Sequence, residues 1–140
     1  MKYKFLKHTA DMKFQAYGKN ISECFKNASY ALREIISEDK IKPVFKKNIK
    51  IIAKSKEELL YNFLEEFLII LDSKGLIMSE VESIEIIKEN NKFRLSAEIY
   101  LDKIKKYKAI TDVKAITYNE MFVNWEKPYK KCKLQVVCDV

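Results

Sequence analysis

The sequence predicts an α+β domain in which two helices accompany about eight strands. Two segments repeat apolar residues at helical spacing, while most other apolar residues alternate with polar ones or form short runs typical of strands. With 48% hydrophobic and 34% charged residues, the chain has the composition of an ordinary globular protein. Its 140 residues suit one α+β domain, covering 1–140, with a sizeable buried core.

The N-terminal part predicts two strands followed by a helix. Residues 2–6 and 11–17 are the strands, and in the second of them apolar and mixed side chains alternate. Asn20 and Glu23 then form a capping box, in which an N-cap side chain and a glutamate three residues later satisfy the first backbone N–H groups. We therefore expect a helix from this point to about Ile36.

A second helix follows after a loop at residues 39–43 and a strand at 49–53. Ser55 and Glu58 form a second capping box, and a Lys-Gly pair ending at Gly75 is typical of a helix C-terminus. The apolar residues of this helix occupy more of its perimeter than one contact surface requires. We therefore expect the helix to be covered on more than one side.

The remainder of the chain predicts strands. The expected segments are residues 76–78, 82–87, 93–101, 111–118, 121–125 and 132–138, with a turn at 89–91. Further loops are expected at residues 102–108 and 126–130.

The charge of the chain is positive, with 27 basic against 20 acidic side chains and a formal net charge of +7. This balance suits contact with nucleic acid or with an acidic protein surface. A lysine-rich solvated surface explains it equally well, because only two of the basic residues are arginines, Arg33 and Arg94, and dedicated phosphate readers favour the arginine fork. Charge alone therefore does not establish RNA binding.

The three cysteines predict neither a disulfide framework nor a zinc site, because their number is odd and no CxxC pair is present. Cys132 and Cys138 lie roughly 20 Å apart on one predicted strand, too far to bridge. Cys24 lies on the apolar face of the first predicted helix. This cysteine usage makes a reducing cytoplasm the expected compartment. We find neither an apolar run of about 18 residues nor a signal peptide.

Two carboxylates at the ends of predicted strands are the main candidates for chemistry. Asp11 follows the only histidine, His8, and Asp139 closes an apolar strand just before Val140. If the fold brings these segments together, their carboxylate and main-chain oxygens would form a pocket suited to Ca²⁺ or Mg²⁺. A turn residue and a solvated charge are the ordinary explanations for these two aspartates, and the residue pattern alone favours them.

Lys114 lies inside the predicted strand 111–118. A strand lysine usually faces solvent or protects a sheet edge; the functional alternative is a charge beside the carboxylates, directed toward a phosphate. A glycine-rich phosphate loop is excluded, because the chain has only two glycines. A nucleophilic pair of His8 with a cysteine has no local pattern to support it.

Four blocks, in their order along the chain, resemble the archease family. They are His8-Thr9-Ala10-Asp11 with residues 16–19, the helix residues 59–66, the segment 113–118, and the ending 136–140. Two residues depart from the family's usual pattern: Asn119 stands where histidine is common, and Asp112 where glutamate is usual.

The resemblance implies a three-layer β/α/β sandwich, with two helices packed between mostly antiparallel sheets. It also implies an accessory protein and not an enzyme. Archeases assist the RtcB-type RNA ligase, which joins the exons of split tRNA using GTP and a divalent metal, by promoting its guanylylation and multiple turnover. The expected partner is this ligase, with tRNA reached through it and no membrane involved, while an oligomer stays open.

The resemblance also assigns site residues. The family's metal ligands carry over onto Asp11, Asp139 and a main-chain oxygen of Val140, with Ca²⁺, Mg²⁺ or Mn²⁺ as the cation. Its functionally required lysine carries over onto Lys114. His8 is expected beside the ligands, where it would support them.

Two other functions compete with ligase activation. A general RNA-binding module, or a chaperone for RNA-modifying enzymes, would account for the positive charge and would bind RNA in a salt-dependent way without a ligase. A metal-dependent hydrolase would use the two carboxylates, but the sequence offers no evident nucleophile and no general base beyond His8. We rank the ligase activator first, the RNA-binding module second and the hydrolase third.

Overall fold

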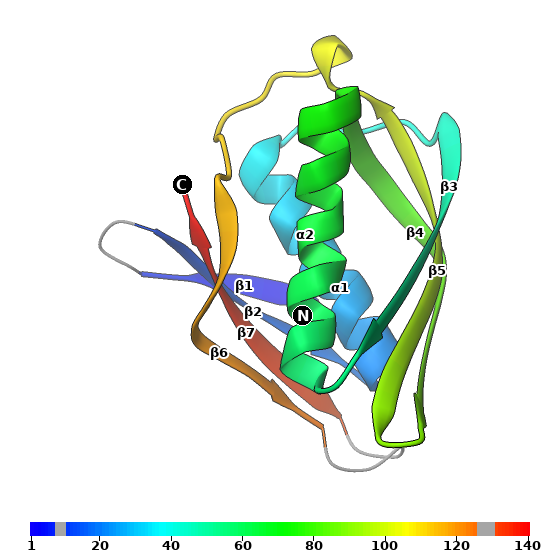
Figure 1. The fold of residues 1–140 in the computed structure, drawn as a ribbon. Helices are drawn as coiled ribbons and strands as arrows, with labels where there is room; N and C mark the ends of the chain where they lie inside the picture. The colour runs from blue at the N-terminus through cyan, green and yellow to red at the C-terminus, as the bar shows by residue number, and fades with distance from the viewer. Residues whose placement is uncertain (8–10, 126–130) are drawn as a thin grey trace.

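Seven strands and two α-helices make up the parts of the chain that the computed structural model describes, residues 1–7, 11–125 and 131–140 (Figure 1). The first half contains β1 (Tyr3–Leu6), β2 (Met12–Gly18), α1 (Ile21–Ile36), β3 (Phe45–Ala53) and α2 (Lys56–Lys74). The second half contains β4 (Leu76–Glu89), β5 (Lys92–Lys103), a short 3₁₀ helix η1 (Ile104–Lys106), β6 (Ala115–Asn124) and β7 (Cys132–Asp139).

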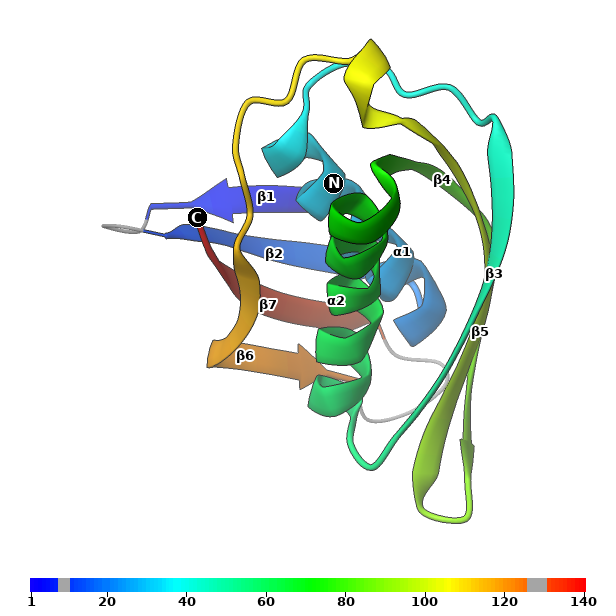
Figure 2. The same cartoon turned by 45° about the horizontal axis from the view of Figure 1, so that its top comes forward.

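The strands form two sheets with the helices between them. One sheet has four strands in the order β1-β2-β7-β6, and the other has three in the order β3-β5-β4. Neighbouring strands are antiparallel in both sheets. α1 packs on β2 and β4, and α2 packs on β6 and β3, so each helix contacts both sheets (Figures 1 and 2). The expected three-layer β/α/β sandwich is confirmed.

Local capping signals set the ends of both helices. The Asn20 side chain accepts a hydrogen bond from the Glu23 backbone N–H at 2.9 Å, and Ser55 Oγ accepts one from the Glu58 N–H at 3.0 Å. Gly75 ends α2 in the left-handed conformation, with φ of 64°. Glycine suits this position because it has no Cβ to clash with the preceding turn.

α2 is the central element of the core. Its buried residues span roughly half of its circumference: Leu59, Leu60, Phe63, Leu64, Phe67, Leu68 and Ile70. Its contacts with both sheets confirm that the helix is covered on more than one side. Within the described parts of the chain, neither helix is both long and apolar enough to cross a membrane.

The separate strands predicted at residues 76–78 and 82–87 are wrong, because both belong to β4. The pairing of β4 with β5 shifts register between Met78 and Glu80 and again between Val81 and Ser83. Such bulges break the alternation of buried and exposed residues without ending the strand. The sequence pattern therefore suggested a gap that is absent from the structure.

The predicted strands 111–118 and 121–125 are also wrong in their bounds. A single strand, β6, begins at Ala115 and continues through a bulge to Asn124. Residues 111–114 precede it, because the partner strand β7 ends at Asp139, directly opposite Ala115. Lys114 therefore lies just before a strand and not inside one.

Candidate metal site

The register of the four-stranded sheet brings the two predicted carboxylates together. Met12 pairs with Cys138, and both side chains face the core. Asp11 and Asp139 each lie one residue beyond this pair, so they are neighbours across β2 and β7 on the outer face of the sheet, where the start of β2 lies beside the end of β7 (Figure 2). Directly opposed strand residues have Cβ atoms about 5 Å apart, close enough for two carboxylates to share a cation.

Lys114, which immediately precedes β6, lies at the same end of the sheet. Its backbone N–H donates a hydrogen bond to the main-chain oxygen of Asp139 at 2.8 Å. The preceding residue, Val113, is buried in the core and anchors the segment, while the Lys114 side chain is exposed. Three segments that are far apart in the sequence thus meet at this point.

The oxygen donors at this end suit a hard cation but do not enclose it. The main-chain oxygen of Asp139 accepts the hydrogen bond from Lys114, and the main-chain oxygen that the resemblance assigns to the site belongs to the next residue, Val140, whose side chain packs against the core. Among the described residues, at this site and at any other, no three Asp, Glu, His or Cys side chains form a metal-binding group. Two carboxylates and one main-chain oxygen supply three donors, whereas Ca²⁺ takes six to eight and Mg²⁺ takes six. The remaining positions would be open to water, to a partner protein or to a phosphate.

A bulge in β6 brings the charged residues Glu120 and Lys13 together close to this site. Sequence reasoning missed both residues. Thr117 pairs with Val137 and Phe122 with Gln135, so residues 118–121 stand opposite Val136 alone. Glu120 lies in this bulge at φ of 55°, a conformation that residues other than glycine rarely adopt.

The bulge crosses the outer face of β7 and reaches β2. The Glu120 carboxylate lies 3.0 Å from Lys13 Nζ, and its main-chain oxygen accepts a hydrogen bond from Gln135 Nε2 at 2.8 Å. Val137 faces outward beneath this crossing and is fully buried. Lys13 lies two residues after Asp11 on the same face, so the candidate metal site (Asp11, Asp139 and Val140) has a second lysine nearby.

Comparison with known proteins identifies the family of this chain. The sequence model of the Archease protein family (MTH1598/TM1083) matches residues 3–140. The chain belongs to the archease family.

Curated archeases resemble this chain over nearly its whole length. Protein archease of Pyrococcus abyssi is 32% identical over 99% of this chain and 99% of its own, and that of Methanosarcina barkeri is 34% identical over 99% of this chain and 95% of its own. The solution structure of Methanobacterium thermoautotrophicum protein 1598 superimposes with a TM-score of 0.83 at 25% identity, covering 99% of this chain and 98% of that one.

Parts of three sequence blocks that resemble archeases lie close together in this archease, whereas residues 16–19 lie at the other end of β2. Residues 113–118 and 136–140 are adjacent on β6 and β7, and Asp11 joins them from β2. The block at residues 59–66 lies on α2, where Tyr61 stacks on Tyr118 with ring centroids 4.3 Å apart. His8 and the predicted loop at 126–130 lie outside the described residues.

The three cysteines of this archease are free and buried. Burial raises the pKa of the Cys138 thiol to about 12, and the negative charge of Asp11 adds to this effect. The effect of Asp11 on this thiol agrees with the strand register, which places Asp11 next to the Met12–Cys138 pair. A thiol with so high a pKa stays protonated at neutral pH and is a poor nucleophile.

Cys24 and Cys132 lie next to each other, a contact that sequence reasoning missed. The Cys24 thiol donates to the main-chain oxygen of Ala16 at 3.4 Å, and the neighbouring Cys132 thiol and burial both raise its pKa. Gly18 makes this approach possible, since it pairs with Cys132 and a Cβ on it would lie 2.4 Å from the backbone nitrogen of Cys24. The sequence signal for this close approach was Gly18 itself, because a glycine at the end of a strand often marks a place where another backbone comes close.

Proposed function

We propose that this archease is an accessory activator of an RtcB-type tRNA-splicing RNA ligase. It would act through a divalent cation, Ca²⁺, Mg²⁺ or Mn²⁺, bound at the candidate metal site. The observation that supports this most is the meeting of Asp11, Asp139 and Lys114 at one end of the four-stranded sheet. A role in the cytoplasm suits the three free thiols.

The residues at the site have separate tasks in this proposal. Asp11, Asp139 and the main-chain oxygen of Val140 would bind the cation, which would supply positive charge to a phosphate and orient it. Lys114, held by its backbone bond to Asp139, would place an ammonium group beside the same phosphate. The incomplete donor set leaves room for ligands from the ligase or its nucleotide, so the site would be completed only in the complex.

A supporting role agrees better with these residues than a reaction of the protein's own. The carboxylates and the lysine can bind and orient, but the thiols are buried and the pKa of Cys138 is raised to about 12. We therefore propose that the chain promotes guanylylation and multiple turnover of the ligase. The tRNA would be reached through that ligase.

Multiple-turnover ligation tests this proposal with the variant Asp139→Asn, which removes the charge but keeps the shape of the side chain. Stimulation of the ligase should fall by about tenfold or more, since even the loss of a residue that supports a metal ligand costs 10–100-fold. Single-turnover ligation and the rate of ligase guanylylation, measured in parallel, show which step depends on the site.

Asp72→Asn is the matched control, because Asp72 is an exposed aspartate on α2 and its substitution changes the net charge equally. It should stimulate the ligase like the wild-type protein. Wild-type stimulation by a folded Asp139→Asn protein would contradict the proposed role of the site.

A further inference from the structure

The outer face of the four-stranded sheet gathers lysines. Lys4, Lys13 and Lys133 come from β1, β2 and β7, and the residues next to them, Tyr3, Phe14 and Leu134, pack into the core. Because side chains alternate along a strand, these three lysines share the opposite, outer face. They follow each other across neighbouring strands and not along a single edge.

A hollow at the far end of this face, away from the candidate metal site, adds two more lysines. It has a volume of about 380 Å³ and is lined by Tyr17, Gly18, Lys19, Glu23, Lys131 and Lys133, among others. The face and the hollow together form what we call the lysine face: Lys4, Lys13, Lys19, Lys131 and Lys133. From the Gly18–Cys132 pair to the Met12–Cys138 pair it extends roughly 20 Å along β2.

The two glutamates on the lysine face have other interactions. Glu23 Oε1 accepts a hydrogen bond from the Lys19 backbone N–H at 3.2 Å, near the start of α1. Glu120 forms the ion pair with Lys13 described above. Five lysines against these two glutamates leave a positive field over the face as far as the candidate metal site, where Asp11 and Asp139 add two negative charges.

Two aromatic rings and two amides lie among these lysines. Tyr17 faces outward from β2, and Phe122 faces outward from β6, where it pairs with Gln135. The Tyr17 hydroxyl donates to Gln15 Oε1 at 3.0 Å, and Gln15 Nε2 donates to Gln135 Oε1 at 2.8 Å. These bonds fix the orientation of the tyrosine and of both amides.

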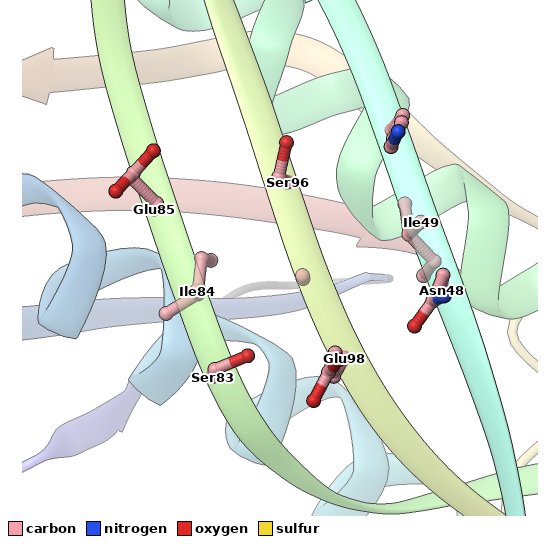
Figure 3. A pocket seen from close by; sticks show the side chains of 9 residues that line it. Asn48, Ile49, Ser83, Ile84, Glu85, Ser96 and Glu98 are labelled. Carbon is pink, nitrogen blue, oxygen red and sulfur yellow. The ribbon is translucent and has the colours of Figure 1, made fainter.

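The outer face of the three-stranded sheet differs in charge. Lys46 pairs with Glu82 at 3.5 Å and with Glu98 at 3.3 Å. The groove beside these pairs, about 450 Å³ in volume, is lined by both Lys50 and Glu85, and Figure 3 shows the polar side chains from all three strands. Opposite charges balance on this face, so it does not attract a polyanion.

The exposed aliphatic side chains also favour different partners for the two faces. Ile52 and Ile87 are 57% and 39% exposed, and both pair with Arg94 on the outer face of the three-stranded sheet. Apolar side chains around an arginine are typical of a protein-binding surface. The lysine face instead offers aromatic rings and positive charge, the combination that binds single-stranded nucleic acid.

We infer that the lysine face binds a single strand of RNA, with its phosphates on the lysines and its bases against Tyr17 and Phe122. The strand would begin at the hollow and end before the candidate metal site, because the bulge at residues 118–121 covers β7 there and the carboxylates of Asp11 and Asp139 repel a phosphate that no divalent cation neutralises. This inference goes beyond ligase activation and needs neither the ligase nor the cation.

Fluorescence anisotropy with a labelled single-stranded RNA of about 12 nucleotides tests the inference, in buffers from 50 to 200 mM KCl that contain EDTA and no ligase. The double variant Lys4→Ala/Lys133→Ala should bind roughly tenfold more weakly at the lowest salt concentration. The slope of log affinity against log salt should also fall by about 1.4, since each phosphate contact contributes about 0.7 for single strands.

The matched control is Lys50→Ala/Lys92→Ala on the outer face of the three-stranded sheet, which also removes two charges from the net +7. It should bind RNA like the wild type. Phe122→Leu should weaken binding at least about fivefold through lost stacking, without changing the salt slope. Thermal melts followed by circular dichroism show that each variant is folded.

Three results would overturn the inference. If the two double lysine variants lose RNA affinity equally, only the net charge of the protein matters. If the wild-type protein does not bind RNA at 50 mM KCl, the lysine face is not an RNA site. Competition by a polyglutamate peptide as strong as by unlabelled RNA would assign the face to an acidic protein. Since the assay contains no ligase and no divalent cation, its failure would leave the metal-site proposal to be decided by ligation with Asp139→Asn.

Discussion

Asp102 shows how one buried charge is stabilised in this fold. It lies at the end of β5 with its side chain fully buried. The Tyr107 hydroxyl and the Lys103 backbone N–H donate hydrogen bonds to it, and Lys106 Nζ lies 3.1 Å from Oδ1. The hydrogen bond from Tyr107 is the main cause that lowers the pKa of this carboxyl, against the opposing effect of burial.

This lowered pKa predicts a loss of stability in acid. Asp102 contributes stability that is fully present above the unfolded-state pKa near 3.8 and is lost as the pH falls through the lower pKa of the folded state. Urea unfolding between pH 2 and pH 6 should therefore show a difference between wild type and Asp102→Asn that shrinks at the acid end. A constant difference across this range would contradict the assignment.

At the scale of elements, the N-cap of α2 should contribute measurably to stability. Ser55→Ala removes the acceptor for the Glu58 backbone N–H and should cost about 1 kcal/mol in free energy of unfolding. Ser73→Ala is the control, because its hydroxyl only donates to the Ile69 main-chain oxygen near the end of the same helix and its loss should stay within about 0.5 kcal/mol. Urea unfolding at neutral pH measures both, and equal losses would count against the cap.

The elements that sequence predicted well are those whose signals are local. Asn20 and Ser55 cap helices through contacts within three residues, and Gly75 ends one by its own conformation. The bulges of β4 and β6 have no such signal, because they depend on which strand lies alongside. Glu120 could not be assigned a role from sequence, since its contact with Lys13 spans 107 positions.

At the scale of the whole molecule, the candidate metal site follows from tertiary pairing. Sequence paired Asp11 and Asp139 only on the condition that the fold brings the two segments together, and the resemblance to archeases gave the reason to expect this. The pairing depends on β2 and β7 being neighbours in the middle of a four-stranded sheet, which the composition of neither strand reveals. Lys114 was predicted inside a strand, but it reaches the site through the backbone bond to Asp139.

This arrangement predicts that the cation and the fold are thermodynamically coupled. Two carboxylates that face each other across a strand pair repel when no cation is bound, because like charges in directly opposed positions are destabilising. In EDTA, Asp139→Asn should therefore be at least as stable as the wild type. With Ca²⁺ or Mn²⁺ at about 100 times its dissociation constant, the free energy of unfolding should rise by about 2.7 kcal/mol for the wild type and should not change for the variant. Thermal melts of both proteins with and without the cation measure this, with Asp72→Asn expected to follow the wild type. If Asp139→Asn is less stable than the wild type in EDTA and is still stabilised by the cation, Asp139 has a purely structural role. Loss of a metal ligand predicts the opposite of both results.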